Sequence, residues 1–540
     1  MAYFSLRAYD ADVHVSSFVG LQQYGPGNYS DVRYAEEEMN VETPAGVLQP
    51  LAANRLLQGE FENRIETVMR FTRRWFEDPA HNEWLVAASG GKLYYLQEDT
   101  DSNWSEIPMP SGIESFQSNV WSWVTYEVNE QEVSHPIDVL IISNDTDGMF
   151  MVVPPERPAK WNDVLGSTNT WGDYSSVTWD DVKSPVAWEI DNLNSNLPKD
   201  EDDQPMKFGV IERYAERIWG AAIPNYPDTL IYSAPFDPTD WEQNTEIPED
   251  GAGQIDQPSW DGQTFTALKA FGDHLLAFKQ HRVWKIMGTD PGQYTIREQF
   301  GGGAPFFNTI AVDVERIFMA SKDGLSVYDG MSVSPYRQRE IEKVWRTVNR
   351  DAMDQMTGAL FKQRYYLAFP VGDSTVNNAL LVYNFTDASI LYSEGVYIES
   401  LLPAEEKLYA TSSELPGKLL EIRYDSWKVG QASGMATKWV TPWMDFGQKQ
   451  IQKGGFDLYI SPEVQNESVV LSFSIQTEKK IKTKTYTVNP VAEPKEQKYK
   501  RLHFSAKGRK FRIIVETAEG VTAPWRLVGG LQLVVETDPD

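Results

Sequence analysis

The sequence predicts an all-β fold: a β-propeller of about seven blades, with an N-terminal arm before it and a C-terminal antiparallel β-sandwich after it. Two observations carry this prediction. A hairpin pattern of short apolar strands recurs seven times along the middle of the chain, and an alternating pattern replaces it from Trp439 onward. We place the arm at residues 1–55, the propeller at 56–430 with an inserted loop at 154–206, and the sandwich at 435–540.

The arm, residues 1–55, contains no copy of the hairpin pattern. It holds short β-like pieces and a Gly-Pro-Gly turn, which indicate an extended segment that docks elsewhere on the molecule. Its first ten residues lack the basic and then apolar order of a secretion signal. We therefore expect synthesis and folding in the cytoplasm.

The repeated unit of the propeller is a polar residue, a short strand that ends in a small residue, a turn, and a second apolar strand. Copies begin between 42 and 79 residues apart, and a unit of about 40–50 residues has room for the four strands of one blade. Small residues such as Ala88, Ala320 and Ala410 would fit a crowded position beside a central channel. The copies begin at Trp84, Asp138, Arg217, His274, Arg316, Arg364 and Lys407.

Two other interpretations of these repeats stay open. Ordinary β-hairpins in two sandwiches would produce the same apolar runs, and a propeller of six or eight blades would also fit the spacing. A closed ring is favoured because it spares an all-β chain of this size long exposed strand edges. One short amphipathic helix is expected over residues 338–348, where Ile341, Val344, Trp345 and Val348 share a face.

The inserted loop at 154–206 interrupts the repeat. Its aromatic residues lie among Asn, Asp, Ser and Pro, and long loops in compact domains are usually functional or disordered. We predict that its tryptophans contact a partner protein, and a loop packed on its own chain is the alternative. The tryptophans are Trp161, Trp171, Trp179 and Trp188.

The C-terminal region shows the alternation of half-buried antiparallel strands, for example over residues 469–475 and 531–535. Between these strands lies a run of lysines, which is either a solvated hairpin face or a patch that meets an acidic neighbour. These lysines are predicted partner contacts: Lys479, Lys480, Lys482 and Lys484.

Charged residues are distributed unevenly along the chain. The chain has 49 Lys and Arg and 78 Asp and Glu residues. Residues 431–540 contain 16 of the basic and 12 of the acidic residues, a net charge of +4. Residues 1–430 therefore contain 33 basic and 66 acidic residues, a net charge of −33. An acidic body argues against non-specific binding to DNA, because such binding depends on Lys and Arg that neutralise phosphates. The acidity is compatible with a duplex that passes nearby, or with solubility alone.

No residue pattern points to catalysis. The chain has no Cys, which excludes disulfides, thiolate zinc sites, iron–sulfur clusters and cysteine nucleophiles. The six histidines show no metal-binding spacing, and no nucleophile elbow or phosphate loop is present. We predict a protein that is not an enzyme and takes no cofactor or metal, although 78 acidic residues leave room for a carboxylate pair that hydrolyses glycosides. No apolar run approaches the ~20 residues of a membrane helix, so we predict no membrane insertion.

The order of these parts resembles one family, the tail nozzle or packaged-DNA stabilisation proteins of tailed bacteriophages, especially short-tailed ones. The resemblance covers most of the chain and is weakest at residues 154–206. The matching segments are residues 46–51, the first hairpin at 84–96, the middle segment 301–345 with Ser321-Lys322-Asp323-Gly324, and the start of the last region at Trp439-Val440-Thr441-Pro442-Trp443.

This resemblance implies a virion protein of the tail. Such proteins form a homo-oligomeric ring, commonly a hexamer, below the portal and adaptor proteins. The ring extends the DNA channel, retains packaged DNA that passes through without specific binding, and docks a tail fibre or tail-tip protein. The family supplies no catalytic residue. The alternative function is a carbohydrate-binding or carbohydrate-cleaving propeller, such as a tail-borne receptor-binding protein or depolymerase, because the 18 tryptophans could stack on sugars. A cytoplasmic propeller scaffold is a further rival.

Overall fold

The structure is a computed structural model, and it is nearly all β, with 51% of residues in strands and 6% in helices. No helix among the residues that it describes is long and apolar enough to cross a membrane. It describes residues 11–23, 32–57, 59–73, 83–97, 101, 103–128, 137–154, 188–256, 262–299, 303, 307–445, 452–490 and 499–538.

Seven four-stranded antiparallel sheets follow one another along the described part of residues 55–422. In the first six sheets the four strands are paired in chain order, with the first strand at one edge. The first four sheets contain β8 (Ile65–Thr72), β9 (Glu83–Ser89), β10 (Lys92–Leu96) and β11 (Ser105–Glu106); β12 (Ser122–Val128), β13 (Ile137–Asn144), β14 (Gly148–Val153) and β15 (Glu189–Asn192); β16 (Val210–Tyr214), β17 (Arg217–Ala221), β18 (Thr229–Tyr232) and β19 (Gly253–Asp256); and β20 (Phe265–Phe271), β21 (His274–Lys279), β22 (Val283–Met287) and β23 (Thr295–Gln299).

The last three sheets have the same order, except that the outermost strand of the seventh comes from the N-terminal segment. They contain β24 (Ala311–Val312), β25 (Ile317–Ser321), β26 (Gly324–Tyr328) and β27 (Val333–Pro335); β28 (Thr357–Phe361), β29 (Arg364–Phe369), β30 (Ala379–Asn384) and β31 (Ile390–Glu394); and β32 (Ser400–Pro403), β33 (Leu408–Thr411), β34 (Leu419–Ile422) and β7 (Arg55–Leu56).

The hairpins that the sequence predicts are the second and third strands of these sheets. In the fifth sheet, for example, β25 and β26 pair with Ala320 opposite Leu325. Central strands are covered on both sheet faces, so they consist of nearly continuous apolar residues. The outer strands β11 and β23 are short or polar, and for this reason they do not stand out in the sequence.

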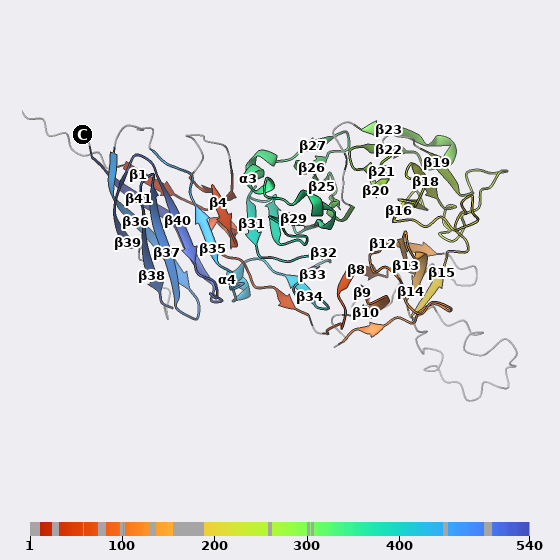
Figure 1. The fold of residues 1–540 in the computed structure, drawn as a ribbon, viewed down its shortest axis with the longest axis horizontal. Coiled ribbons are helices and arrows are strands. Elements are labelled where there is room, and N and C mark those ends of the chain that lie inside the picture. Colours follow the sequence, from red (N-terminus) through yellow and green to blue (C-terminus); the bar gives the residue numbers. More distant parts are fainter. Residues whose placement is uncertain are drawn as a thin grey trace, which may run out of the picture.

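The seven sheets form a ring. A separate apolar cluster lies between each consecutive pair of sheets, and one further cluster joins the seventh sheet to the first. In that cluster Ile65 and Leu85 pack with Leu402 and Leu419. The described residues therefore form a β-propeller, which Figure 1 shows beside the terminal strands.

The final sheet is completed by β7 (Arg55–Leu56) of the N-terminal segment. Leu56 pairs with Leu420 and Arg55 with Glu421, and the Leu57 amide donates to the carbonyl oxygen of Leu419 at 2.9 Å. Leu57 itself is buried. The first and last parts of the propeller are thus joined by hydrogen bonds as well as by apolar packing.

The prediction that the small residues lie beside the central channel is wrong. Ala88, Ala320 and Ala410 lie in second strands and are buried in the clusters between neighbouring sheets. The strands nearest the axis are the first strands of each unit. Small residues are needed in the second strands because two sheets approach each other there, and not because of the channel.

Two further sheets lie at the end of the molecule that carries the C-terminus (Figure 1). They share one apolar core that includes Phe456, Phe473, Ile513 and Leu533. One sheet has the order β1 (Ala11–Val15), β41 (Trp525–Asp538), β36 (Gln452–Val464) and β39 (Lys500–Gly508), and the other has the order β38 (Ile481–Val488), β37 (Val469–Thr477), β40 (Phe511–Thr517), β35 (Thr437–Val440) and β4 (Glu37–Met39).

The N-terminal segment supplies one strand to each terminal sheet and also touches the propeller. Asn40 donates its amide to the carbonyl oxygen of Tyr392 at 3.0 Å and accepts the amide of Glu394 on its Oδ1, also at 3.0 Å. Both partners belong to β31, a strand of the sixth sheet. The segment also forms β2 (Gly20–Leu21), β3 (Tyr34–Ala35), β5 (Val41–Glu42), β6 (Gln49–Pro50) and the 3-10 turn η1 (Pro44–Gly46).

The helix expected over residues 338–348 is confirmed in a shorter form. It consists of a 3-10 turn, η6 (Gln338–Ile341), and one turn of α-helix, α3 (Glu342–Trp345), and all four residues of its predicted apolar face are buried. The other short helices are η4 (Pro291–Gln293), η5 (Phe307–Thr309), η7 (Arg350–Gln355) and α4 (Ser426–Val429).

A buried carboxyl group, Glu42, lies where the N-terminal segment meets the chain after the last propeller strand. Glu42 is 0% exposed, and its oxygens accept the amides of Ala52 at 2.9 Å and Asp425 at 2.8 Å and the Gln49 Nε2 at 3.2 Å. Burial outweighs these hydrogen bonds and raises the pKa of Glu42 to about 7. At neutral pH the junction thus contains a carboxyl group close to its titration point.

This pKa predicts a pH dependence of stability. The folded protein keeps the Glu42 proton to about pH 7, whereas the unfolded chain loses it near pH 4.5, so the folded state binds more protons between these values. The free energy of unfolding of the wild type should therefore fall as pH rises through this window, relative to Glu42→Gln, by up to about 1.4 kcal/mol per pH unit. Urea denaturation at pH 5, 6, 7 and 8 measures both slopes. Equal slopes in the two proteins would contradict the assignment.

Candidate functional site

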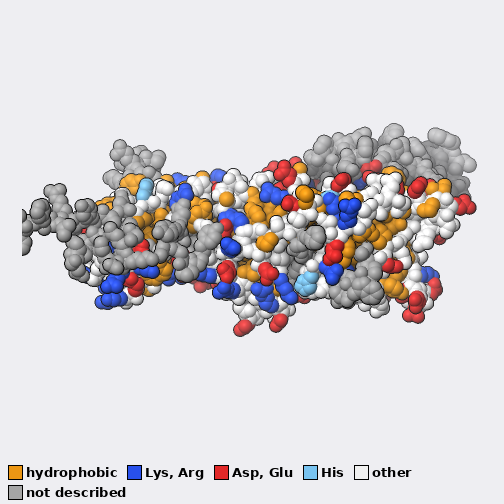
Figure 2. All heavy atoms as spheres, turned by 90° about the horizontal axis from the view of Figure 1, so that it is seen from above, with side chains coloured by type: hydrophobic (Ala, Val, Ile, Leu, Met, Phe, Trp, Pro, Cys, Tyr) orange, Lys and Arg blue, Asp and Glu red, His pale blue; other side chains and the backbone are white. Residues whose placement is uncertain are grey.

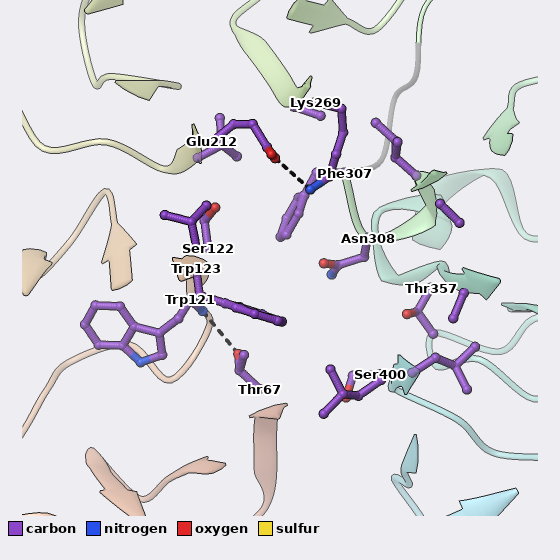
Figure 3. A pocket seen from close by; sticks show the side chains of 18 of the residues that line it. Thr67, Trp121, Ser122, Trp123, Glu212, Lys269, Phe307, Asn308, Thr357 and Ser400 are labelled. Atoms are coloured by element: carbon purple, nitrogen blue, oxygen red, sulfur yellow. Dashed lines mark hydrogen bonds and ion pairs between the residues drawn. The ribbon is translucent and has the colours of Figure 1, made fainter. Parts of the chain in front are cut away.

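A cavity of about 540 Å³ lies on the axis of the propeller. Its wall is made by the first strands of all seven sheets, β8, β12, β16, β20, β24, β28 and β32, together with η5. Most of these strands contact the first strand of the next sheet, β32 contacts β8, and η5 contacts both β20 and β28. The cavity therefore exists because the ring is closed, and every sheet contributes to it (Figure 3).

An ion pair connects two neighbouring sheets at this wall. The Nζ of Lys269 in β20 lies 2.7 Å from the Oε2 of Glu212 in β16, and the two side chains are 35% and 14% exposed. The pair points into the cavity in Figure 3. Because Lys269 is still in contact with solvent, the pair contributes no more than about 1 kcal/mol to stability.

Trp121, which directly precedes β12, and Trp123, which lies within it, have different roles. The Trp121 amide donates to the Thr67 Oγ1 at 3.1 Å, and the Trp121 ring packs on Phe116 and Phe150 with centroids 4.9 and 5.9 Å apart. The Trp121 ring points away from the cavity, whereas the ring of Trp123 points toward it (Figure 3). Trp121 anchors the wall, and Trp123 forms part of its surface.

The cavity surface combines aromatic rings with uncharged polar groups. Trp123 and Phe307 face Asn308, Thr357 and Ser400 across the space in Figure 3. Such a surface can bind a small neutral ligand through stacking and hydrogen bonds. Among the described residues no group of three or more His, Asp or Glu side chains is placed to hold a metal ion.

The sequence did not point to these cavity residues. Thr67, Trp123, Glu212 and Lys269 all lie in first strands, where polar and apolar residues alternate weakly and the apolar run of the hairpin has not begun. These residues could have been found by examining the segment directly before each repeated hairpin, because that segment forms the strand nearest the axis.

The structure places the predicted partner contacts in different environments. Trp161, Trp171 and Trp179 lie outside the described residues. The prediction for Trp188 is wrong, because this side chain is only 3% exposed and packs between the first two sheets. Its ring lies 4.9 Å from that of Tyr95 and 6.1 Å from that of Trp84. Trp188 precedes β15 and is a core residue, in spite of its polar neighbours in the sequence.

The four predicted lysines, Lys479, Lys480, Lys482 and Lys484, are all exposed. They lie on β38 and on the turn before it, far from the propeller axis (Figure 1). They do not belong to the central cavity and form a separate surface.

Comparison with known proteins gives only distant structural likenesses. No protein-family model matches the chain, and no curated protein matches it in sequence. Among solved structures, BBS1N in complex with ARL6DN is 11% identical, with a TM-score of 0.37 over 69% of this chain and 97% of that one. The Pan2 WD40 domain of Neurospora crassa is 8% identical, with a TM-score of 0.32 over 67% and 90%. An exo-β-1,3-galactanase from Phanerochaete chrysosporium is also 8% identical, with a TM-score of 0.24 over 62% and 98%. At these scores the likenesses add nothing to what the strand pairing shows.

Substitutions of Trp121 and of Lys269, both at the cavity wall, should differ strongly in their effect on the free energy of unfolding. Trp121→Ala removes a buried ring and should lower the free energy of unfolding by about 3–5 kcal/mol. Lys269→Met should lower it by less than about 1 kcal/mol. Chemical denaturation followed by circular dichroism measures both variants. A Trp121→Ala effect as small as that of Lys269→Met would contradict the packing described here.

Proposed function

We propose that this chain is a structural protein of a bacteriophage tail and a subunit of a ring below the portal and adaptor proteins. In this proposal the seven four-stranded sheets are the blades of a seven-bladed propeller, and the two terminal sheets form a β-sandwich. The ring extends the DNA channel, retains packaged DNA and docks a fibre or tail-tip protein. The protein belongs to the virion and performs no catalysis.

The observation that carries this proposal is the segregation of charge. Residues 1–430 have a balance of −33, and residues 431–540 have a balance of +4. A bore lined by the acidic part would repel a DNA polyanion weakly and uniformly, since no cluster of Lys and Arg would neutralise phosphates and retain the duplex. DNA could then slide past without being trapped.

The propeller cavity is not the proposed DNA channel. Its volume is about 540 Å³, and the ion pair between Glu212 and Lys269 lies at its wall. A duplex whose major groove alone is about 12 Å wide does not fit into such a space. In the proposed ring the DNA therefore passes between subunits, along an axis that no single chain contains.

Assembly is the property that tests this proposal. Purified protein at micromolar concentration should form closed rings of about six subunits in negative-stain images and mass photometry. An antibody against the chain should label one vertex of the virion, at the tail. A protein that stays monomeric at all concentrations tested and labels no virion would contradict the proposal.

A second candidate function is carbohydrate binding by the propeller cavity. The observation that favours it is the combination of Trp123 and Phe307 with the polar groups of Asn308, Thr357 and Ser400. Aromatic rings stack on apolar sugar faces, and hydroxyl and amide groups bond to sugar hydroxyls.

Under this second candidate, a capsular polysaccharide or its oligosaccharides should bind the wild type, and Trp123→Ala should weaken binding at least about tenfold. Isothermal titration measures the affinity, and an assay of reducing ends detects cleavage. Lys322→Met is the control, because this exposed lysine lies in the turn between β25 and β26 and neither strand lines the cavity. Equal affinity of the wild type and Trp123→Ala would remove this candidate.

A further inference from the structure

We propose that the lysines of β38 and of the turn before it bind an acidic surface on the propeller of a second copy of this chain, so that copies associate head to tail. We call Lys479, Lys480, Lys482 and Lys484 the lysine edge. This inference rests on the proposed ring, and it names the two surfaces that would meet between neighbouring subunits.

The lysine edge lies on the border of a sheet. β38 is the outermost strand of its five-stranded sheet, and β37 is its neighbour in that sheet. Lys482 pairs with Ile475 and Lys484 with Phe473, both of which are core residues. Residues directly opposite in an antiparallel pair point to the same side, so these lysines emerge from the core side of the sheet.

Lysines in this position have two effects. Charged side chains that point inward on an edge strand discourage another strand from adding to the sheet. The same side chains extend past the core toward solvent. The Nζ of Lys484, for example, lies 5.9 Å from the centroid of the Phe504 ring. The edge is therefore suited to contact through side-chain charge and not through an added strand.

Apart from the contact of Lys484 with the Phe504 ring, the described residues give the lysine edge no charged partner. None of its four lysines forms an ion pair with another residue in the described part of the protein. Elsewhere the exposed lysines commonly do so, as Lys343 does with Glu36 and Lys362 with Glu406. A partner surface of opposite charge would complete the edge.

The propeller presents such a surface at its rim. Two loops carry it, one between β15 and β16 and the other between β18 and β19, and Asn196 of the first donates its Nδ2 to the carbonyl oxygen of Thr239 in the second at 3.1 Å. We call the exposed carboxylates of these loops the acidic rim: Glu201, Asp202, Asp203, Asp237, Glu242, Glu246, Glu249 and Asp250.

The larger of these loops is held in place from within. Arg217 is 1% exposed, and its Nη1 donates to the carbonyl oxygens of Ser233 and Gly251 at 2.8 and 2.7 Å. Trp241 is buried, with its ring 5.0 Å from that of Phe208. The carboxylates therefore extend from an anchored loop, and little conformational entropy is lost when they bind.

The two surfaces lie at opposite ends of the molecule, whose long axis is horizontal in Figure 2 as well as in Figure 1. β38 is at one end of the long axis, and β15, β18 and β19 are at the other (Figure 1). The two surfaces cannot meet within one chain. Contact between two different surfaces on successive copies generates a closed ring when the rotation between copies closes.

Charge reversal tests this contact. The variant with Lys479, Lys480, Lys482 and Lys484 changed to Glu should raise the dissociation constant of assembly at least about tenfold, and so should the variant with Glu201, Asp202, Glu242 and Glu246 changed to Lys. A chain that carries all eight changes should assemble about as well as the wild type, because the charges are exchanged. Mass photometry at 50 and 300 mM NaCl measures assembly, and the wild type should dissociate more at the higher salt. Circular dichroism checks that each variant folds.

The control variant changes Lys322, Lys343, Lys362 and Lys428 to Glu, which alters the net charge by the same amount at other exposed positions. It should assemble as the wild type does. Rings that form in both charge-reversed variants as readily as in the wild type would overturn this inference and leave the proposed ring intact. A wild type that forms no rings would overturn both.

Discussion

The fold depends on the pairing of the N-terminal segment with strands that lie hundreds of residues away. β1 pairs with β41 and β4 with β35 in the terminal sheets, and β7 pairs with β34 in the last sheet of the propeller. An unpaired strand edge leaves backbone groups without partners and invites association with other chains. The same segment therefore completes three sheets, and neither half of the molecule is complete without it. Contacts of such long range also slow folding, because the entropy of closing a long loop is lost before they form.

Closure by β7 positions the features to which we assign function. The central cavity needs the first strands of all seven sheets, so a ring that opened between β32 and β8 would lose its wall. The same segment joins the propeller to the terminal sheets through Asn40 and the buried Glu42. The lysine edge and the acidic rim are thereby kept at opposite ends of one body (Figure 1).

The sequence predicted the elements that local physics determines. The central hairpins could be recognised because strands covered on both faces need continuous apolar residues, and the lysines of β38 could be recognised as exposed. The closing strand could not, because β7 has only two residues and its partner lies more than 360 residues away. Trp188 was misjudged, since polar neighbours along the chain do not reveal the aromatic rings that surround it in space. The cavity residues were missed because first strands carry weaker patterns than the hairpins that follow them.

The closing strand can be tested directly, because the chain contains no Cys. Arg55 and Glu421 are paired across β7 and β34, at a separation that a disulfide can span. In the variant with Arg55→Cys and Glu421→Cys, mild oxidation of the folded protein should form an intramolecular disulfide, seen as faster migration on a non-reducing gel. The variant with Met39→Cys and Lys438→Cys, at a pair in the terminal sheet, serves as a positive control. A disulfide in the control but none between positions 55 and 421 would contradict closure of the ring by the N-terminal segment.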